Sequence, residues 1–568
     1  MRYYVLATDY DGTLAKDGKV NDDTLKALKQ VKKSGRKIIL VTGREMKELE
    51  MVFPEYGVFD LIVAENGALI LNPENQQEIL LGSRPPDNFI DELKNKNVFP
   101  LSVGKIIVAT WEPHENTVLK AIKNAGIEHQ VIFNKGAVMV LPPGINKAKG
   151  LTEALNHLRM SMHNIVAIGD AENYNAMLQA AECPVAVANA LDSVKEQAAF
   201  VTTADHGEGV SELINHLIEN DLAAADRNLK KQYLSIGKMQ NEQEYAISPY
   251  KDGVLLAGSS GGGKSTLTTA FLESLKEKQY QFCLIDPEGD YAEVEEAVIV
   301  GTAEQPPVTE EIMNLLLDPA KNVIICLLAI DIDKRPAFFN ELFPKIVELR
   351  KSKGHPHWMI IDEINHMLSV EKETSFYNVP QELNNLWLIT TDPGNVNKAV
   401  IRLVNTIIAV GDEPLKSLQD FAASKEIFLP QLNFTSINKG QALVWDTSLK
   451  QQPQIITTNK PKQLNRRHIK KYATGFMDYN SFYFTGAKHK LNLKAYNVMV
   501  FSQLAEGIDD ETWIYHLKRN DYSRWFRNSL HDNDMADMTQ KIENSDGDVL
   551  TSKAEILKLI RKRYTEPG

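Results

Sequence analysis

Two acidic residues near the start of the chain stand where a parallel sheet would place a reactive site. The stretch ATDYDGTLA puts Asp9 and Asp11 directly after an apolar run, and Gly12 allows the chain to turn there. Open α/β sheets collect their sites at the carboxyl ends of strands. Two carboxylates this close need a cation or a proton between them, and such an oxygen-rich site suits Mg²⁺. One carboxylate can then attack phosphorus while the other moves protons.

Three further stretches supply the partners that such a reaction needs. LVTGRE places Thr42 at a second strand end, where its hydroxyl and the next backbone N–H can hold a phosphoryl oxygen. PPGINKAKGL offers Lys147 as a counter-charge, and AIGDAENYNAM puts Asp170 at another strand end as a further metal ligand. A lone DxD is a weak signal and is often a solvated turn. The longer DxDGT, together with these stretches, is much more specific.

In this order the four stretches resemble the haloacid dehalogenase (HAD) superfamily, and within it the Cof-type, sugar-phosphate and phosphoglycolate phosphatases. The resemblance covers about residues 1–218, with a small α/β cap inserted at about 84–145. It implies that Asp9 is the nucleophile that forms an aspartyl-phosphate and that Asp11 is the general acid and base. Thr42 and Lys147 would bind and neutralise the transferring group. The metal site implied for Mg²⁺ consists of Asp9, Asp11, Asp170 and Asn173.

Tyr174 departs from that family pattern. The family carries a second aspartate where GDAENYNAM has Tyr174, and a phenol cannot supply its charge. The nucleophile and Asp170 remain, so a weakened phosphatase site is expected. A pseudo-phosphatase is the alternative.

A second phosphate-handling stretch lies in the middle of the chain. GVLLAGSSGGGKSTLTTAFLESLKEK reads as strand, glycine-rich loop and helix, and contains GxxxxGKS. Backbone N–H groups of such a loop wrap a polyphosphate, the lysine reaches the β- and γ-phosphates, and the serine binds Mg²⁺. The residues expected to hold ATP and its Mg²⁺ are Gly258, Gly261, Gly262, Gly263, Lys264, Ser265, Thr266 and Asp362.

The apolar stretch HWMIIDEINHML ends a later strand in Asp362 and Glu363. The aspartate would hold Mg²⁺ through water, and Glu363 would polarise the attacking water as a catalytic residue. With CLIDPEGDY, LITTDPGN and INKGQALV, these stretches resemble the HerA/FtsK group of P-loop ATPases over about 245–450. Members of that group often form hexamers that pump DNA or protein. Here the span between the glycine-rich loop and Asp362 is short, so nucleic-acid pumping is not favoured.

Apolar runs alternate with helical patterns in both blocks, which predicts α/β folds with parallel sheets. The expected organisation is a Rossmann-like phosphatase at 1–220, a connector at 221–242, a P-loop ATPase at 243–456, a connector at 457–470, and a small mainly helical domain at 471–568. The aromatic residues of that last segment are expected to form its core.

The composition restricts the partners and the cellular compartment that are expected for the protein. The formal net charge of the 568 residues is −12, unlike a protein that coats nucleic acid. Three cysteines lie far apart without metal-ligand spacing, which suits buried thiols in the reducing cytoplasm. No apolar run approaches the length of a membrane span.

The sequence therefore predicts a cytoplasmic Mg²⁺-dependent phosphomonoester hydrolase fused to an ATP-binding and ATP-hydrolysing domain that regulates or assembles it. Its partners would be a small phosphorylated metabolite, ATP and further copies of the chain, with no membrane. The alternative is an ATP-driven HerA-like motor, or an assembly linked to nucleic acid, with a vestigial phosphatase head.

Overall fold

The computed structural model describes most of the chain as two compact units. The described residues are 1–134, 136–171, 175–250, 253–368, 384–431, 436–449, 451–462, 481–487, 491–530, 532–545 and 548–565. The first unit consists of Met1–Gly258, Phe271–Gly289 and Glu296–Thr458. The second consists of Ser259–Ala270, Asp290–Glu295 and Asn459–Gly568. Glu172, Asn173 and Tyr174 lie outside the described residues.

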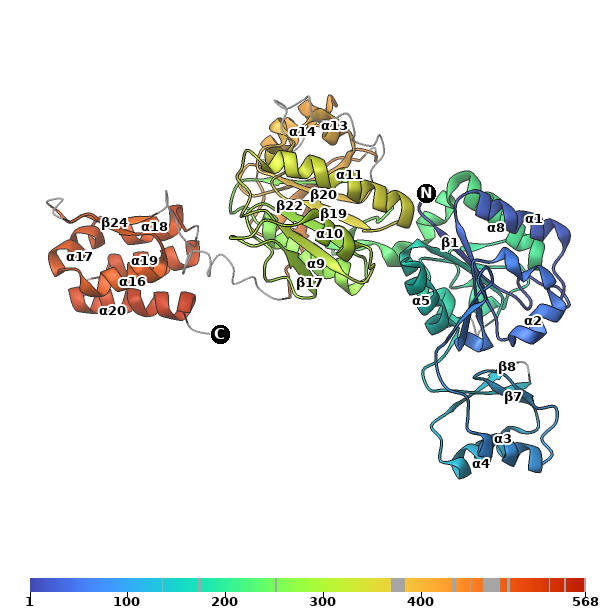
Figure 1. Ribbon diagram of the computed structural model, residues 1–568. Coiled ribbons are helices and arrows are strands. Elements are labelled where there is room, and N and C mark those ends of the chain that lie inside the picture. The colour runs from blue at the N-terminus through green and yellow to red at the C-terminus, as the bar shows by residue number, and fades with distance from the viewer. Residues whose placement is uncertain are drawn as a thin grey trace. The chain divides into compact units, whose positions relative to one another are not determined.

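An eight-stranded sheet forms the core of the first module (Figure 1). In spatial order its strands are β12 (Phe200–Val201), β11 (Cys183–Ala186), β10 (Ile165–Gly169), β1 (Val5–Asp9), β2 (Lys37–Val41), β3 (Leu61–Ala64), β4 (Leu69–Asn72) and β5 (Gln77–Leu80). The strands from β12 to β3 are parallel, and β4 and β5 add antiparallel pairs. Every residue of β1 and β10 is buried, as their continuous apolar runs predict.

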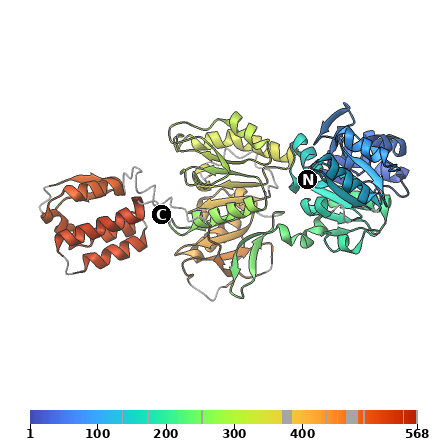
Figure 2. The same ribbon diagram turned by 90° about the horizontal axis from the view of Figure 1, so that it is seen from below.

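Helices cover this sheet (Figures 1 and 2). Helix α1 (Asp22–Lys33) packs against α8 (His206–Asn220), and α5 (Lys147–Leu158) packs against β3 and α6 (Asn175–Ala180). Helix α1 begins at an asparagine cap and is followed by a glycine. The Asn21 side chain accepts a hydrogen bond from the Thr24 backbone N–H at 2.7 Å, and Gly35 has a φ of +86°.

A small α/β cap is inserted between β5 and α5. It contains a four-stranded antiparallel sheet with its own apolar core. The elements of the cap are α3 (Asp87–Asn95), β6 (Ser102–Val103), β7 (Val108–Trp111), α4 (Glu115–Ala125), β8 (Gln130–Asn134) and β9 (Ala137–Leu141).

The second module is built on an eleven-stranded mixed sheet. The order is β14 (Glu244–Ile247), β13 (Leu234–Met239), β23 (Gln454–Thr458), β22 (Gln441–Asp446), β21 (Val404–Val410), β15 (Gly253–Gly258), β20 (Leu386–Thr390), β19 (Trp358–Ile361), β16 (Phe282–Asp286), β18 (Asn322–Cys326) and β17 (Ala297–Val300). The strands from β21 to β17 are parallel. Its helices are α9 (Lys264–Glu277), α10 (Thr309–Leu316), α11 (Arg335–Lys353), α12 (Ile364–Met367), α13 (Lys398–Arg402) and α14 (Pro414–Lys425).

The connector expected at 221–242 differs from the structure in its second half. Residues 234–239 form β13, which pairs antiparallel with β14 and with β23. The partner β23 lies more than two hundred residues away along the chain. A short, half-polar strand is hard to recognise from its own sequence when it pairs with a strand so far away along the chain.

The two modules of the first unit are in direct contact. The hydroxyl of Tyr4 donates to the backbone carbonyls of Arg350 (2.8 Å) and Lys351 (3.0 Å) at the end of α11. The two modules pack closely against each other at Gly354. A Cβ added at this glycine would lie 2.7 Å from the Tyr4 ring and 2.5 Å from Asn164 Nδ2. Only glycine fits this contact without a shift of its neighbours.

The carboxyl-terminal segment of the second unit is mainly helical. In the described part of this segment, a two-stranded ribbon, β24 (Phe482–Phe484) and β25 (Leu493–Ala495), precedes five α-helices. These are α16 (Val498–Gly507), α17 (Asp510–Leu517), α18 (Asp521–Asn528), α19 (Asn533–Glu543) and α20 (Val549–Ile560). The expected aromatic core is present, with Trp513 stacked on Tyr522 at 4.3 Å between ring centroids.

The expected α/β fold class with a helical terminal segment is confirmed. Among the described residues, no helix is both long enough and apolar enough to cross a lipid bilayer. All three cysteines are buried thiols, and burial raises the pKa of Cys183 and of Cys283 to about 12.

Candidate active sites

Asp9 and Lys147 form a buried pair at the carboxyl edge of the first sheet. Asp9 ends β1 and is fully buried, and Lys147 begins α5 and is 2% exposed. Lys147 Nζ donates to Asp9 Oδ1 at 3.4 Å. Burial lowers the pKa of Lys147, and the charge of Asp9 opposes that shift. A buried ammonium facing a buried carboxylate can neutralise an anion that attacks or leaves beside it.

Asp170 lies next to this pair because β10 is the parallel neighbour of β1, with Thr8 opposite Ile168. The turn after β1 passes close to its carboxylate. A Cβ added at Gly12 would lie 2.4 Å from Asp170 Oδ2, and the Thr13 hydroxyl is 3.5 Å from Asp170 Oδ1. Two buried carboxylates from adjacent strand ends, beside a turn that offers backbone carbonyls, make an oxygen-only donor set. That chemistry fits Mg²⁺.

The structure places Thr42 one residue beyond β2, where Val41 is the partner of Asp9. Thr42 is 1% exposed, and its hydroxyl accepts a hydrogen bond from the Arg44 backbone N–H at 3.1 Å. The expected phosphoryl-binding hydroxyl therefore lies on the strand adjacent to the expected nucleophile. Asp9, Thr42, Lys147 and Asp170 share one edge of the sheet.

Asp11 is bound by Arg44, which is not among the predicted site residues. Arg44 Nε donates to Asp11 Oδ2 at 2.8 Å, and Arg44 Nη2 donates to Asp11 Oδ1 at 2.6 Å. This hydrogen bond is the main reason why the pKa of Arg44 is raised. The arginine belongs to the LVTGRE stretch, but nothing local indicates which carboxylate it binds. Within the described residues, no cluster of three or more histidine, cysteine or acidic side chains is gathered tightly enough to hold a metal.

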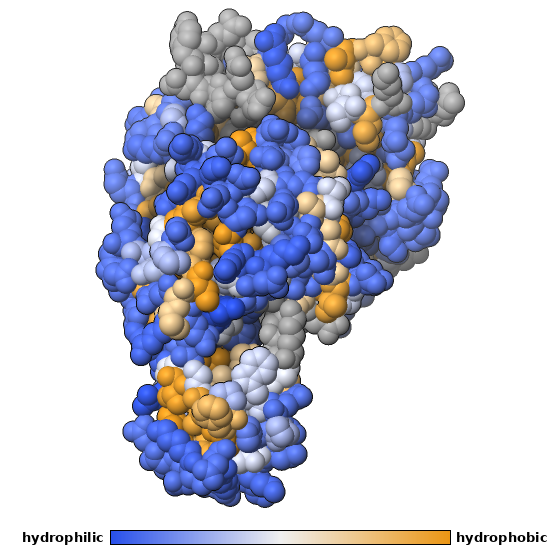
Figure 3. All heavy atoms as spheres, turned by 90° about the vertical axis from the view of Figure 1, so that its right-hand side faces the viewer, coloured by the Kyte–Doolittle hydropathy of each residue, from blue (hydrophilic) through white to orange (hydrophobic). Residues whose placement is uncertain are grey.

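A cavity of about 490 Å³ opens beside Asp11 and Arg44. Its walls come from both the core and the cap, including Glu45, Ser102 and Trp111. Figure 3 shows apolar side chains gathered on the cap, the lower lobe in that view. The large apolar residues exposed on the cap include Phe99, Trp111 and Phe133. A volume of this size accepts a small metabolite.

Glu65 fastens the cap to the core. This carboxylate is 1% exposed and accepts hydrogen bonds from three consecutive backbone N–H groups of the cap. The bonds are from Lys105 (2.9 Å), Ile106 (2.8 Å) and Ile107 (2.9 Å). A charged group held by three backbone donors fixes the segment that carries them.

Replacing Glu65 with glutamine is expected to lower kcat/KM of the phosphatase by roughly 10- to 100-fold, because a small misplacement of the cap misplaces the substrate. Glu78→Gln is the matched control, since Glu78 pairs with the Lys105 ammonium on the surface. Steady-state kinetics and thermal melting of the two variants check this. Equal activity in both variants would contradict the role of Glu65.

The glycine-rich loop follows β15 in the second module. A Cβ at Gly258 would lie 2.3 Å from the Val410 carbonyl oxygen, so this strand end admits only glycine. Gly261 and Gly263 have φ values of +76° and +100°, which turn the backbone of the loop. Gly262 N–H donates to the Ser259 carbonyl at 3.0 Å. The loop is described over its whole length, including Thr266, which is exposed.

Lys264 and Ser265 begin the fourteen-residue helix α9. Lys264 is 8% exposed, and its ammonium donates to the Ser259 carbonyl at 3.2 Å. The Ser265 hydroxyl donates to Asp290 Oδ2 at 3.4 Å. A helix start with a lysine, a hydroxyl and a glycine-rich approach fits a polyphosphate with Mg²⁺.

Asp362 and Glu363 directly follow β19. Since β15, β20 and β19 are parallel neighbours, their carboxyl ends share one edge of the sheet. Asp362 is 5% exposed and accepts from the Glu363 backbone N–H at 2.9 Å; Glu363 has a φ of +45°. Beside them the Thr390 hydroxyl donates to Asn365 Oδ1 at 3.0 Å.

Comparison with known proteins finds two family models that match parts of the chain. A family model of haloacid dehalogenase-like hydrolases matches residues 6–96 and 83–214, and a model of the central domain of helicase HerA matches residues 234–386.

The relatives that match the first module include three that each cover about 38% of this chain. The phosphoglycolate phosphatase of Nitrosopumilus maritimus is 28% identical over 226 residues, which are 97% of that protein. The phosphoglycolate phosphatase of Methanothermobacter thermautotrophicus is 30% identical over 223 residues, 98% of its length. A 5-amino-6-(5-phospho-D-ribitylamino)uracil phosphatase of Bacillus subtilis is 28% identical over 240 residues, 95% of its length.

Proposed function

Because the chain belongs to the haloacid dehalogenase-like hydrolases through its first module and carries a HerA-type domain behind it, we propose a Mg²⁺-dependent phosphomonoester hydrolase joined to an ATPase. The phosphatase acts through an aspartyl-phosphate. The observation that carries this proposal is the buried Lys147–Asp9 pair beside Asp170 at adjacent strand ends.

In the proposed reaction, an Asp9 carboxylate oxygen attacks phosphorus and the ester P–O bond breaks. Asp11 gives its proton to the leaving oxygen. Water then attacks the phosphorus of the aspartyl-phosphate, Asp11 takes a proton from that water, and the bond from Asp9 to phosphorus breaks. Thr42 and Lys147 hold the phosphoryl oxygens throughout. Asp11 has to leave Arg44 before it can donate, so their ion pair describes a resting arrangement.

Mg²⁺ would be held by Asp9, the Asp11 backbone carbonyl and Asp170, with Asn173 as a further proposed member of the site. When bound, it would supply positive charge that stabilises the phosphoryl group during transfer. The replacement of the family's second aspartate by Tyr174 weakens this site in our proposal without abolishing it.

The second module is proposed to bind and hydrolyse ATP. Gly258, Gly261, Gly262, Gly263 and Thr266 form the cradle. Lys264 would contact the phosphates, Ser265 and Asp362 would hold Mg²⁺, and Glu363 would orient the attacking water. The match to the HerA central domain supports this proposal.

The substrate is proposed to be a small phosphomonoester selected by the cap. The cavity of about 490 Å³ and the names of the relatives support a compound such as phosphoglycolate or a phosphorylated sugar derivative. The Arg44 guanidinium, once released from Asp11, can bind a second anionic group of the substrate.

Nucleotide binding is proposed to control the phosphatase or its assembly into an oligomer. Helix α9 begins at the glycine-rich loop, and Tyr280, just beyond its end, contacts the first module through Glu182 (2.9 Å). The proposal places the protein in the cytoplasm, supported by its three buried thiols. Nucleic acid is not favoured as a partner, given the net charge of −12.

The test is phosphate release from a panel that includes phosphoglycolate, sugar phosphates and a ribitylamino-uracil phosphate. Each is measured with Mg²⁺, after removal of divalent metal, and with a non-hydrolysable ATP analogue. We expect release that requires Mg²⁺ and changes with the analogue. No release from any compound, together with ATP turnover stimulated by a polynucleotide, would overturn the proposal in favour of a HerA-like motor.

A further inference from the structure

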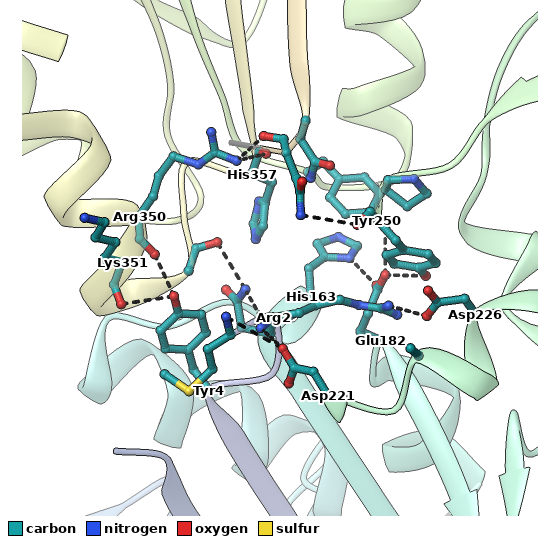
Figure 4. Close-up of a pocket in the computed structure, with 18 of the residues that line it drawn as sticks. Arg2, Tyr4, His163, Glu182, Asp221, Asp226, Tyr250, Arg350, Lys351 and His357 are labelled. Carbon is teal, nitrogen blue, oxygen red and sulfur yellow. Dashed lines mark hydrogen bonds and ion pairs between the residues drawn. The ribbon is translucent and has the colours of Figure 1, made fainter. Parts of the chain in front are cut away.

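A cavity of about 380 Å³ lies where the two modules of the first unit meet (Figure 4). It is separate from both sites described above. The first module contributes residues before β1 and β10, and the second contributes the end of α11 and the approach to β19. Its volume lies within the range of ligand pockets in proteins, about 300–1,000 Å³.

The acidic residues in the wall are already neutralised. Glu182 accepts from His163 Nδ1 (2.7 Å) and from the hydroxyls of Tyr250 (2.7 Å) and Tyr280 (2.9 Å). Burial opposes ionisation, but the charge and hydrogen bond of His163 hold the pKa of Glu182 below its usual range. Asp226 pairs with Arg2, and Asp221 pairs with Arg36 at 2.9 Å.

Arg350 has no such partner in the described part of the chain. Its Nη2 donates to the backbone carbonyls of Asn384 (2.7 Å) and His357 (3.3 Å), and no carboxylate of the described residues forms an ion pair with it. Burial lowers the pKa of this guanidinium to about 10. A buried cation without a counter-charge is costly, so an anion bound beside it would be stabilised.

Unsatisfied polar atoms concentrate around the same cavity. Among the described side chains, five buried atoms of its wall make no hydrogen bond: Arg2 Nε, Asn164 Oδ1, Arg350 Nη1, His357 Nε2 and Asn385 Oδ1. Native proteins leave few buried polar atoms unpaired, and a cluster of them indicates a missing polar partner.

The protonation of His357 defines one of these atoms as a donor. His357 is 5% exposed, and its Nδ1 accepts from the Gln281 backbone N–H at 2.9 Å. Burial is the main reason why the pKa of His357 lies far below its usual value, so the ring is neutral. Because Nδ1 accepts a hydrogen bond, the single ring proton is on Nε2. Figure 4 shows the His357 ring between Arg350 and His163.

From this arrangement we infer that the joint cavity binds a small hydroxylated anion that bridges the two modules. Arg350 Nη1 and His357 Nε2–H would donate to its phosphate or carboxylate group. The Asn164 and Asn385 side-chain oxygens would accept from its hydroxyl groups. The ligand would contact both modules at once, because Asn164 belongs to the first and the other three to the second.

The test is isothermal titration of the full chain carrying Asp9→Asn and filled with a non-hydrolysable ATP analogue. The probes are inorganic phosphate, glycolate and ribose 5-phosphate, which separate a phosphate site from a carboxylate site and show whether hydroxyls add affinity. Each probe is compared in this background and with Arg350→Gln, Asn385→Asp or Lys345→Gln added. Lys345 lies on α11 like Arg350 but pairs with Glu341 on the surface.

We expect binding of at least one probe to weaken by about tenfold or more with Arg350→Gln, because a charged hydrogen bond is lost. Asn385→Asp should weaken binding of the anion similarly, because the aspartate has nearly the shape of asparagine but its negative charge repels the anion. It should leave the unliganded melting temperature unchanged or raised, which guards against mere unfolding. Lys345→Gln should bind within about twofold of the background.

Two results would overturn the inference. Equal binding in all three variants would place the anion elsewhere, and no binding of any probe in the background protein would mean that the cavity holds water only. The titration requires no turnover, so its outcome does not depend on the proposed catalytic function.

Discussion

Replacing Asp9 with asparagine is expected to reduce phosphomonoester turnover by roughly 10⁴-fold or more, as loss of a nucleophile does in other covalent catalysts. The amide has almost the shape of the carboxylate but cannot attack phosphorus to form the acyl phosphate. The measurement is phosphate release from the best substrate of the panel, with Mg²⁺ and at saturating substrate. After the reaction is quenched with acid, the covalent phosphoprotein expected for the parent chain should also be absent from this variant.

The same substitution removes the counter-charge of Lys147, whose ammonium is almost fully buried. Loss of one member of a buried pair costs about 3–5 kcal/mol, so thermal melting has to be measured alongside activity. Asp23→Asn on the exposed face of α1 is the control and should change neither property. Retained turnover in folded Asp9→Asn would refute the aspartyl-phosphate route.

Lys264→Ala is expected to abolish measurable ATP turnover, with a loss of roughly 10²–10³-fold or more. Lys264 is the charged donor of the glycine-rich loop, and its present partner, the Ser259 carbonyl, holds it at the base of that loop. Without it the β- and γ-phosphates lose their compensating charge. Nucleotide affinity and ATP hydrolysis should fall together.

Lys321→Ala provides the control, because the ion pair described for this surface lysine is with Asp318, nearby in sequence. Phosphomonoester hydrolysis without nucleotide should be the same in Lys264→Ala as in the parent chain. Its response to an ATP analogue should be absent. A response that survives in Lys264→Ala would show that the analogue acts elsewhere, and the regulatory proposal would fail.

Much of both sites follows from local sequence, because the expected residues in the described part of the chain lie at or just beyond strand ends or at the starts of helices. Continuous apolar runs identify buried parallel strands, and parallel strands of one sheet end at one edge. Asp9, Thr42 and Asp170 therefore meet although more than one hundred residues separate the first from the last. The roles proposed for these residues remain predictions, and Asn173 lies outside the described part of the chain.

The contacts that could not be predicted are those between side chains far apart in sequence. Arg44 reaches Asp11 across thirty-three positions, and Glu65 reaches the cap across forty or more. An arginine or a glutamate carries no sign of its partner, and either would be equally acceptable on a solvated surface. The contact between the two modules could not be predicted for the same reason. Tyr4 binds the end of a helix some 346 residues away in the sequence.

Glu182 has a consequence for how the chain matures. Two of the three side chains that satisfy this buried carboxylate, Tyr250 and Tyr280, belong to the second module. During synthesis the first module leaves the ribosome before either tyrosine has been made, and amino-terminal domains generally fold first. Of these three described partners, His163 is therefore the one available to Glu182 until the chain has been made up to Tyr250 and Tyr280. The last of these hydrogen bonds form only when the start of the ATPase is in place.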